Sequence, residues 1–274
     1  MVLPRMGQGT WKMGEDPARR AEEIAALREG IALEMTMIDT AEMYGEGLSE
    51  SLVGEAIRPL DRQSVYLVSK VYPHNAGKSR IFRSAENSLK RMGVPYMDLY
   101  LLHWRGGVML SETVTCMEEL KKSGLIKSWG VSNFDTSDMK ELFSIPGGGN
   151  CAVNQVLYHL GSRGIEFELL PWLKAHNVPV MAYCPLAQES LLKPELFKSR
   201  AVNEVAKKYG VTPAQVLLGF ILRDEALIPI PKAGSKQHVR ENAAMLHIPL
   251  DDDDIRLLNE VFPAPHYKTP LDVE

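Results

Sequence analysis

The sequence predicts an α/β fold, a single (β/α)8 TIM barrel with an extra C-terminal helix. Eight short apolar runs alternate with amphipathic stretches, and the unit repeats about every thirty residues, the length of a βα unit. No linker or low-complexity segment divides the 274 residues, so residues 1–274 are expected to form one domain. The G-x-G-x-x-G turn of a doubly wound dinucleotide fold is present only as the fragment Gly7 to Gly9. Eight such units close most economically into a barrel.

The expected strands are short runs of apolar and β-branched residues bounded by turn residues. Most of them end next to a polar or aromatic side chain. In chain order they cover residues 5–9, 35–39, 65–70, 98–103, 128–131, 152–155, 178–183 and 227–230.

The expected helices lie between these strands. In the first, within residues 16–33, Asp16 is expected as the N-cap and Pro17 as the first helical residue. In the segment 111–124, a capping box at Ser111 and a stop at Gly124 mark the two ends. Pro171 should bend or break the helix expected around it. The other helical segments are 79–93, 165–177, 199–210 and 212–224, and the acidic segment 251–262 predicts the extra helix.

Composition limits the kinds of partner. A net charge of −4 and a pI near 6.0 give no general attraction for nucleic acid or an anionic membrane, so neither is expected. Three widely spaced cysteines, Cys116, Cys151 and Cys184, form no C-x-x-C pair, and the N-terminus carries no secretion signal. The seven histidines show no H-x-H or H-E-x-x-H spacing, so no metal site is predicted. We therefore expect a cytoplasmic protein, a monomer or weak homo-oligomer, that binds a small molecule.

The residues at the strand ends point to chemistry. In a parallel barrel, the loops after the C-terminal ends of the strands form the active face. Nearly every expected strand delivers a polar or aromatic side chain to that face, and the set is Thr10, Trp11, Asp39, Lys70, His103, Ser132, Asn133, Gln155, Tyr183 and Lys232.

Four side chains at or near the strand ends are expected to act together. Taken singly, Asp39 could cap a turn, Lys70 could extend from a strand end and His103 could be a buried core histidine. Their position on consecutive strand ends, with Tyr44 shortly after the aspartate, favours a common role. A lysine ammonium beside Tyr44 would lower its pKa from about 10 and let the phenol act as a general acid. Asp39 would keep Lys70 charged, and His103 would orient and polarise a substrate carbonyl.

The same face suits a redox cofactor. None of the four groups is a source of electrons, so a hydride must come from a bound carrier. Ser132, Asn133 and Gln155 suit the carboxamide of a nicotinamide, and the ring of Tyr183 suits stacking against it. The sequence therefore predicts an enzyme that reduces a carbonyl group with a nicotinamide.

Longer motifs carry a resemblance over nearly the whole chain. They are GQGTW at 7–11, IDTAEMYG at 38–45, SK at 69–70, LLHW at 101–104, GVSNF at 130–134, NQ at 154–155, AYCPLA at 182–187 and IPIPKAGSKQHVRENAA at 228–244. With these motifs the chain resembles the aldo-keto reductases, most closely the bacterial members associated with methylglyoxal and other small aldehydes. The resemblance implies a catalytic tetrad of Asp39, Tyr44, Lys70 and His103, with Tyr44 as proton donor and reduced nicotinamide as hydride donor.

The resemblance also implies a cofactor site and a substrate pocket. NADPH is the expected cofactor, because a basic cluster containing Lys232, Lys236 and Arg240 lies where such enzymes hold the 2′-phosphate. Ala233 and His238 stand where the family often has serine and arginine, so NADH is an alternative. The cofactor residues implied are Gly9, Thr10, Trp11, Asp39, Ser132, Asn133, Gln155, Tyr183, Pro185, Leu186, Ile230, Lys232, Ala233, Gly234, Ser235, His238, Arg240, Glu241 and Asn242. A small carbonyl substrate would lie among Trp11, Tyr44, Tyr72, His103 and Trp104.

Two other functions stay open at this point. A lysine at a barrel strand end can form a Schiff base once its pKa is depressed, so Lys70 could serve an aldolase. The neighbouring Asp39 argues against that role, because it would keep the amine charged. The same barrel could instead be a cofactor-sensing module that binds nicotinamide with little turnover. Consumption of NADPH with small aldehydes separates the enzyme from the sensor.

Overall fold

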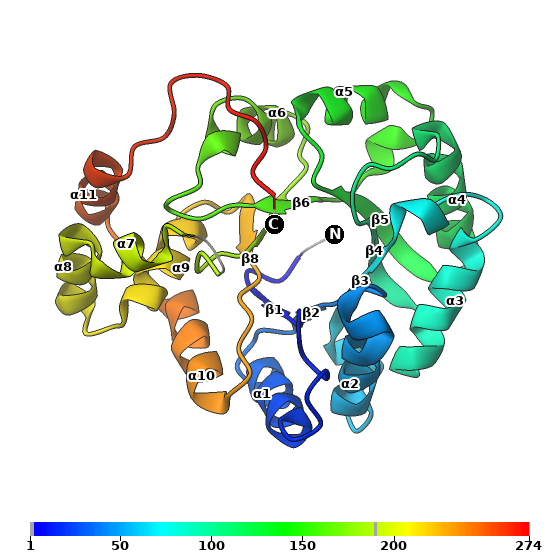
Figure 1. Ribbon diagram of the computed structural model, residues 1–274, viewed down its shortest axis with the longest axis horizontal. Helices are drawn as coiled ribbons and strands as arrows, with labels where there is room; N and C mark the ends of the chain where they lie inside the picture. Colours follow the sequence, from blue (N-terminus) through cyan, green and yellow to red (C-terminus); the bar gives the residue numbers. More distant parts are fainter. Residues whose placement is uncertain (1–2, 189–190, 274) are drawn as a thin grey trace.

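The computed structural model describes residues 3–188 and 191–273, and within these ranges eight parallel strands stand side by side in chain order (Figure 1). All eight predicted strands are present, and no end differs from its prediction by more than two residues. The strands are β1 (Gly7–Gly9), β2 (Met37–Asp39), β3 (Tyr66–Val71), β4 (Met97–Leu102), β5 (Ile126–Ser132), β6 (Asn154–Leu157), β7 (Val180–Tyr183) and β8 (Leu227–Pro229). The predicted barrel is therefore confirmed.

The barrel closes at a narrow seam. Gly9 forms a parallel bridge with Lys232, which follows β8, and the amide of Gly9 donates to the carbonyl oxygen of Pro231 at 3.1 Å. A Cβ atom at Gly9 would lie 2.9 Å from the carbonyl oxygen of Ile230, so only glycine allows the two segments to approach this closely. The seam places Lys232 beside the end of β1, on the active face.

Inside the barrel, side chains follow the two-residue period of a strand. A layer of buried apolar residues fills the interior and includes Met37, Val68, Leu101, Val153 and Met181. The inward positions two residues further along the same chain segments are the predicted site residues Asp39, Lys70, His103, Gln155 and Tyr183. The strands thus carry an apolar plug beneath a polar layer, and the polar layer lies at the C-terminal ends.

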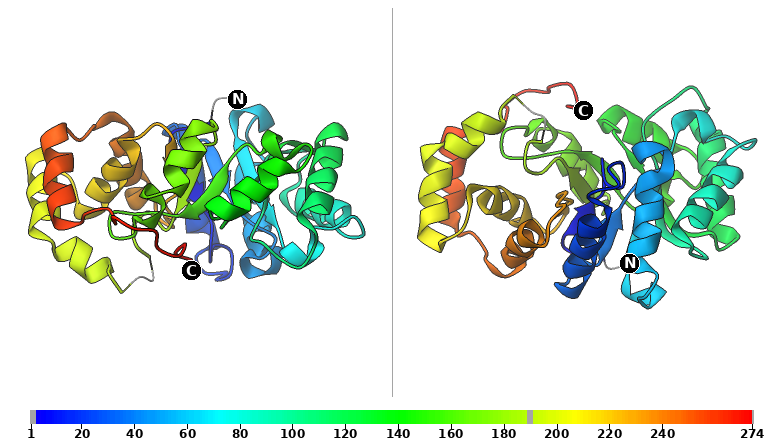
Figure 2. Two further views of the ribbon diagram at one scale, coloured as in Figure 1. Left: turned by 90° about the horizontal axis from the view of Figure 1, so that it is seen from above. Right: turned by 60° about the horizontal axis from the view of Figure 1, so that its bottom comes forward.

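Helices surround the strands on all sides (Figures 1 and 2). They are α1 (Arg20–Ala32), α2 (Leu48–Ile57), α3 (Ile81–Met92), α4 (Leu110–Lys122), α5 (Thr136–Ser144), α6 (Leu169–Ala175), α7 (Lys193–Lys198), α8 (Arg200–Tyr209), α9 (Pro213–Leu222), α10 (Lys236–Ala244) and α11 (Asp252–Val261). The extra C-terminal helix is α11, which packs on α8 and begins with a capping box formed by Asp251 and Asp254. None of the helices described is long and apolar enough to cross a bilayer.

Two predicted helix starts were wrong. The first helix begins at Arg20, because Asp16 accepts the amide of Ala18 at 2.9 Å and so stabilises a separate turn before the helix. The fourth begins at Leu110, whose buried side chain anchors the first turn, so Ser111 lies inside the helix and caps nothing. The predicted stop at Gly124 is confirmed, because this glycine follows the helix with a φ of 80°.

Pro171 lies within the first turn of α6, where a backbone N–H has no partner in the helix to lose. The predicted break therefore falls before the proline. It divides the segment into a short 3-10 turn, Gly164–Glu166, and the helix itself. Helices α2, α5, α7 and α10 were not among the segments predicted from residue patterns, although the capping box of Asp135 and Asp138 was a legible signal for α5.

Candidate active site

A cavity of about 360 Å³ opens at the C-terminal ends of the strands. It brings together most of the side chains predicted from the strand ends, namely Gly9, Thr10, Trp11, Asp39, Tyr44, His103, Trp104, Ser132, Asn133, Gln155, Tyr183, Ile230 and Lys232. The sequence prediction missed five lining residues, which are Lys12, Met43, Cys184, Gln188 and Lys193. Lys12 and Cys184 adjoin predicted residues, whereas Lys193 is the first residue of α7, a helix that was not predicted.

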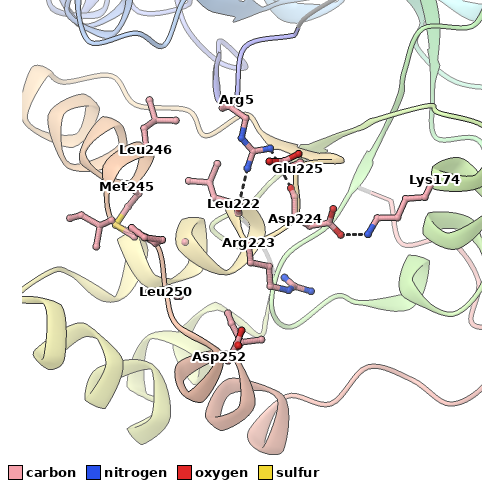
Figure 3. A pocket seen from close by; sticks show the side chains of 14 residues that line it. Arg5, Lys174, Leu222, Arg223, Asp224, Glu225, Met245, Leu246, Leu250 and Asp252 are labelled. Carbon is pink, nitrogen blue, oxygen red and sulfur yellow. Dashed lines mark hydrogen bonds and ion pairs between the residues drawn. The ribbon is translucent and has the colours of Figure 1, made fainter.

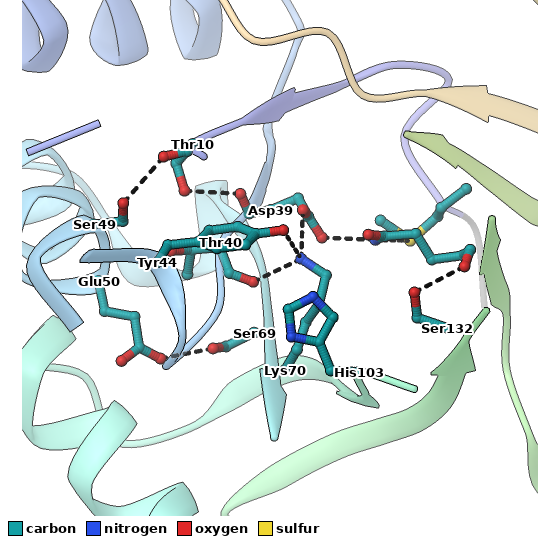
Figure 4. Close-up of polar contacts among 12 residues, drawn as sticks. Thr10, Asp39, Thr40, Tyr44, Ser49, Glu50, Ser69, Lys70, His103 and Ser132 are labelled. Carbon is teal, nitrogen blue, oxygen red and sulfur yellow. Dashed lines mark hydrogen bonds and ion pairs between the residues drawn. The ribbon is translucent and has the colours of Figure 1, made fainter. Parts of the chain in front are cut away.

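At the base of the cavity, one lysine connects a carboxylate and a phenol (Figure 4). The Nζ atom of Lys70 donates to Oδ2 of Asp39 at 2.7 Å, to the carbonyl oxygen of Thr40 at 2.9 Å and to Oη of Tyr44 at 3.1 Å. Lys70 is fully buried, and Asp39 is nearly so. The three ammonium hydrogens therefore have three partners, and one of these is the predicted proton donor.

The electrostatics of this chain keep the lysine charged. Burial alone would lower the pKa of Lys70, but the negative charges of Asp39 and of an ionised Tyr44 outweigh burial, and the net shift is upward. Burial also raises the pKa of Tyr44, and the ammonium of Lys70 offsets only part of that rise. The expectation of a lowered pKa for Tyr44 is thus wrong, because the loss of water around the phenol outweighs the neighbouring cation. The phenol starts in its protonated form, as a proton donor requires.

His103 lies over the phenol as a neutral base. Its ring meets the ring of Tyr44 edge-on, with centroids 5.8 Å apart. Burial, and then the charge of Lys70, lower the pKa of His103 to about 2, so the imidazole carries no charge near neutral pH. Its Nδ1 atom is buried and has no hydrogen-bond partner among the described residues. Because Nδ1 is buried, the hydrogen bond that the neutral imidazole can give to a substrate oxygen would come from Nε2, the other ring nitrogen.

A second set of contacts fixes the loops that carry the site. The hydroxyl of Thr10 donates to the carbonyl oxygen of Asp39 at 3.0 Å, and the hydroxyl of Ser49 donates to the carbonyl oxygen of Thr10 at 3.0 Å. On the outer side of β3, Ser69 donates to Glu50 at 2.6 Å, and Glu50 is fully buried on α2. These contacts lock α2, and the loop bearing Tyr44, against the barrel. The sequence prediction missed Glu50, since a helical glutamate normally faces water.

The residues predicted for the nicotinamide form one hydrogen-bonded row. Nε2 of Gln155 donates to Oδ1 of Asp39 at 2.8 Å, and the hydroxyl of Ser132 donates to the carbonyl oxygen of Gln155 at 2.8 Å. The hydroxyl of Tyr183 donates to Oδ1 of Asn133 at 2.9 Å. Asn133 has a φ of 59°, in the left-handed region that asparagine tolerates better than most residues. The row is therefore held in place by its own contacts.

The residues predicted for the adenosine phosphate lie beyond the seam, around the start of α10. Ala233 and Gly234 are buried, Ser235 is the N-cap of α10, and His238 is exposed. Arg240 is engaged elsewhere, because its Nε atom donates to Glu29 of α1 at 2.7 Å. The other members of the prediction are less available. Glu241 bonds with Gln215 and Gln237, and Asn242 is buried on α10. Pro185 and Leu186 follow Tyr183 in the chain, and Pro185 is buried.

Among the residues predicted for the substrate, Trp11 and Trp104 line the cavity, but Tyr72 does not. The ring of Tyr72 meets Trp104 edge-on, with centroids 5.9 Å apart, and stacks on His74. Trp104 is 36% exposed and also touches His103. Tyr72 therefore supports the outer wall of the cavity from behind.

A larger hollow, of about 770 Å³, lies near Arg5 and Asp224, which immediately precede the β1 and β8 regions (Figure 3). Its charged groups satisfy the fold: Arg5 donates to the carbonyl oxygens of Leu222 and Asp224, and Lys174 pairs with the carboxylate of Asp224. Size alone would select this hollow, but it lacks the buried acid, base and phenol of the smaller cavity. Within residues 3–188 and 191–273, no group of His, Cys, Asp or Glu could hold a metal ion.

The groups of the smaller cavity can move a proton and orient a carbonyl, as in a barrel oxidoreductase that takes its hydride from a bound carrier. The chain belongs to the aldo/keto reductase family, whose sequence pattern matches residues 5–262.

Several similar proteins share about half of their residues with this chain. The chain is 52% identical to methylglyoxal reductase YeaE of Escherichia coli over 271 residues, which are 99% of this chain and 95% of the relative. Among solved structures it is similar to an aldo-keto reductase from Klebsiella pneumoniae in complex with NADPH, with a TM-score of 0.97, 51% identity and coverage of 99% and 95%. A structure from the same organism with NADP and acetate has a TM-score of 0.97, 51% identity and coverage of 99% and 96%.

Proposed function

We propose that this protein reduces small aldehydes and ketones to alcohols, using NADPH as the reductant. The observation that carries the proposal is the contact of 3.1 Å between Nζ of Lys70 and Oη of Tyr44 at the base of the cavity. It is supported by the similarity to a methylglyoxal reductase and to a reductase crystallised with NADPH. Methylglyoxal, simple aliphatic aldehydes and aromatic aldehydes are the proposed substrates.

The residues present fit a nicotinamide dinucleotide. The cavity runs from Tyr44 and His103 to Lys232 at the seam, so one end can take a reacting group and the other a phosphate. Tyr183 offers a ring face, and the row of Ser132, Asn133 and Gln155 offers amide and hydroxyl groups to a carboxamide. When bound, the reduced nicotinamide supplies the hydride. Lys232, Ser235, His238 and Arg240 are the proposed phosphate ligands, although Arg240 must exchange its contact with Glu29 to take part.

The chain's own residues supply the proton and the orientation. His103, as a neutral donor, holds the substrate oxygen near Tyr44 and polarises the carbonyl. As negative charge develops on that oxygen, Tyr44 transfers its phenolic proton to it, and the alcohol is complete. Lys70 stabilises the resulting phenolate, and Asp39 keeps the lysine charged and in place. The raised pKa of Tyr44 at rest prevents early loss of the proton.

The cavity walls indicate the class of substrate. Trp11 and Trp104 present aromatic surfaces beside the reacting groups, and the cavity of about 360 Å³ is shared with the cofactor. Little enclosed space is left for the carbonyl compound. We therefore propose that small, partly apolar carbonyls bind, and that bulkier groups extend past the half-exposed Trp104 into water.

The two alternatives are weaker on this geometry. A Schiff-base aldolase needs an uncharged lysine, whereas Lys70 has three hydrogen-bond acceptors and a raised pKa. A cofactor sensor would need no proton donor, yet Tyr44 lines the cavity and contacts the lysine. We also propose that the protein acts in the cytoplasm as a monomer or weak homo-oligomer, where the buried thiols of Cys116 and Cys151 stay reduced.

The decisive experiment measures steady-state loss of NADPH with methylglyoxal, an aliphatic aldehyde and a benzaldehyde, and NADPH binding by fluorescence in parallel. Turnover with several of them, and none in the absence of carbonyl, supports the proposal. Tight NADPH binding without turnover of any carbonyl would favour the sensor. Trapping of substrate on Lys70 by borohydride, without need for a nicotinamide, would favour the aldolase.

A further inference from the structure

Arg19 lies where two helices meet beside the proposed cofactor site. It occupies the N-cap position of α1, and α1 packs along α10 (Figures 1 and 2). Gly234 lies immediately before Ser235, which is the N-cap of α10. The packing of the two helices therefore brings a cation from the β1–α1 loop to the loop that follows β8, although about two hundred residues separate them in sequence.

Two cations converge on the backbone of Gly234. A Cβ atom at this glycine would lie 2.7 Å from Nη2 of Arg19 and 3.7 Å from Nζ of Lys232. The absence of a side chain at Gly234 lets both groups approach one point. That point lies at the start of α10, where free backbone N–H groups favour an anion.

Two other cations near the start of α10, Arg240 and Lys236, interact with a carboxylate. Arg240 donates to Glu29 at 2.7 Å, and Lys236 lies 3.6 Å from the same carboxylate. Within residues 3–188 and 191–273, no carboxylate is hydrogen-bonded to the side chain of Arg19. Two of the basic residues around α10 are thus partly neutralised by Glu29, whereas Arg19 is not.

The charges around Lys232 agree with this arrangement. Burial lowers the pKa of Lys232, and Arg19 and then Lys12 lower it further by repulsion, while Glu23 and Glu15 act in the opposite direction. Glu23 is itself buried and accepts the amide of Gly14 at 2.9 Å. The two cations near this glycine repel each other, and an anion bound between them would offset that repulsion.

We infer that Arg19, together with Lys232, binds the 2′-phosphate of NADPH and sets the preference for NADPH over NADH. The inference rests on the proposed function. Lys12 and Lys232 line the cavity, whereas Arg19 and Gly234 lie beyond its end. A dinucleotide with its nicotinamide beside Tyr183 would extend past Lys232, so its adenosine end would reach the residues beyond the cavity. Arg19 would then meet the phosphate that only NADPH carries, and a guanidinium binds such a group through two parallel hydrogen bonds.

The test compares the dissociation constants of NADPH and NADH, measured by calorimetry on the full chain without substrate. For Arg19→Gln the Kd of NADPH is expected to rise about tenfold, and that of NADH by less than about twofold, because only one charge-assisted contact is lost. Arg19→Lys should lie between the variant and the wild type. Arg20→Gln is the matched control, because Arg20 lies one position along and pairs with Glu55 at 2.9 Å.

Each outcome decides one question. An unchanged Kd for NADPH in Arg19→Gln would overturn the inference while leaving the proposed function intact. An equal loss for both nicotinamides would place Arg19 on the shared diphosphate and refute its role in selectivity. Adenosine 2′-monophosphate should bind less well to Arg19→Gln, whereas adenosine 5′-monophosphate should not. If the wild type binds neither NADPH nor NADH, the proposed function fails instead.

Discussion

Lys70 and Lys174 each pair with an aspartate, but they lie in different regions of the barrel and differ in their access to water. Lys70 has a fully buried side chain, and Asp39 is 3% exposed, whereas Lys174 is 46% exposed and Asp224 is 22% exposed. Water screens the pair formed by Lys174, so that pair changes the properties of its neighbours little. The pair formed by Lys70 is unscreened, and its charge acts on Tyr44 and His103.

The comparison shows why the larger hollow is not the better candidate for a site. Around the larger hollow, Arg5 is spent on two backbone carbonyls, and Arg223 bonds Tyr158 and Glu166. In the smaller cavity, the imidazole of His103 and the phenol of Tyr44 both line the open space, and the imidazole is held uncharged. Charges that hold the fold together have partners already, while a site keeps groups for its substrate.

The largest effect is expected for Tyr44→Phe. Removing the hydroxyl deletes the proposed proton donor but keeps the ring, so kcat for aldehyde reduction should fall about a thousandfold, within the range for general acids. The Kd of NADPH should stay within about twofold, because the cofactor surface is preserved. Steady-state assays and fluorescence titration measure the two quantities. A variant with wild-type kcat would remove Tyr44 from the mechanism.

The variant Lys70→Met tests how much more the buried ion pair contributes to stability than the exposed pair of Lys174. It leaves the carboxylate of Asp39 buried without its cation, so the free energy of unfolding should fall by about 3–5 kcal/mol. Chemical denaturation monitored by circular dichroism measures this change. A loss below about 1 kcal/mol would show that water reaches the pair and that its burial has been overestimated.

The rate of carbonyl reduction should not depend on protonation of His103 near neutral pH. Because its pKa is lowered to about 2, kcat/KM should show no inflection near its ordinary value of 6.5. An inflection there that disappears in His103→Gln would contradict a neutral imidazole. His103→Ala should lower kcat/KM about a hundredfold, because the carbonyl loses its orienting donor.

The same residue predicts how stability depends on pH. In the unfolded chain His103 takes up a proton below its ordinary value of 6.5, but in the folded protein it does so only near 2. Stability is therefore retained above 6.5 and lost as the pH falls below that value, by at most about 1.4 kcal/mol per pH unit. His103→Gln should lack this component in denaturation series.

The smallest effect is expected for Lys174→Met. Its partner Asp224 remains accessible to water, so the free energy of unfolding should change by less than about 1 kcal/mol. The kinetic constants for any carbonyl should not change, because Lys174 does not line the smaller cavity. A change as large as that in Lys70→Met would erase the distinction between the two regions.

Much of the fold and of the candidate site could be predicted from the sequence, because apolar strand segments alternate with amphipathic helical segments. Asp39, Lys70 and His103 each follow an apolar run, so their place at the C-terminal ends of strands was legible, and the eight strands were confirmed. The net rise in the pKa of Tyr44 was not legible, because it depends on how much water the folded loop excludes. The contact of Arg240 with Glu29 and the approach of Arg19 to Gly234 depend on how α1 packs on α10. Residues so far apart in the chain give no local pattern.

The barrel closes where Gly9 pairs with Lys232, and the dinucleotide is proposed to lie across this seam. A ligand that binds residues on both sides of the seam would stabilise the closed barrel, because it would have to dissociate before the barrel unfolds. At a hundred times its Kd, such a ligand adds about 2.7 kcal/mol to the free energy of unfolding. With NADPH bound, the protein should accordingly withstand heat and proteases for longer than without it.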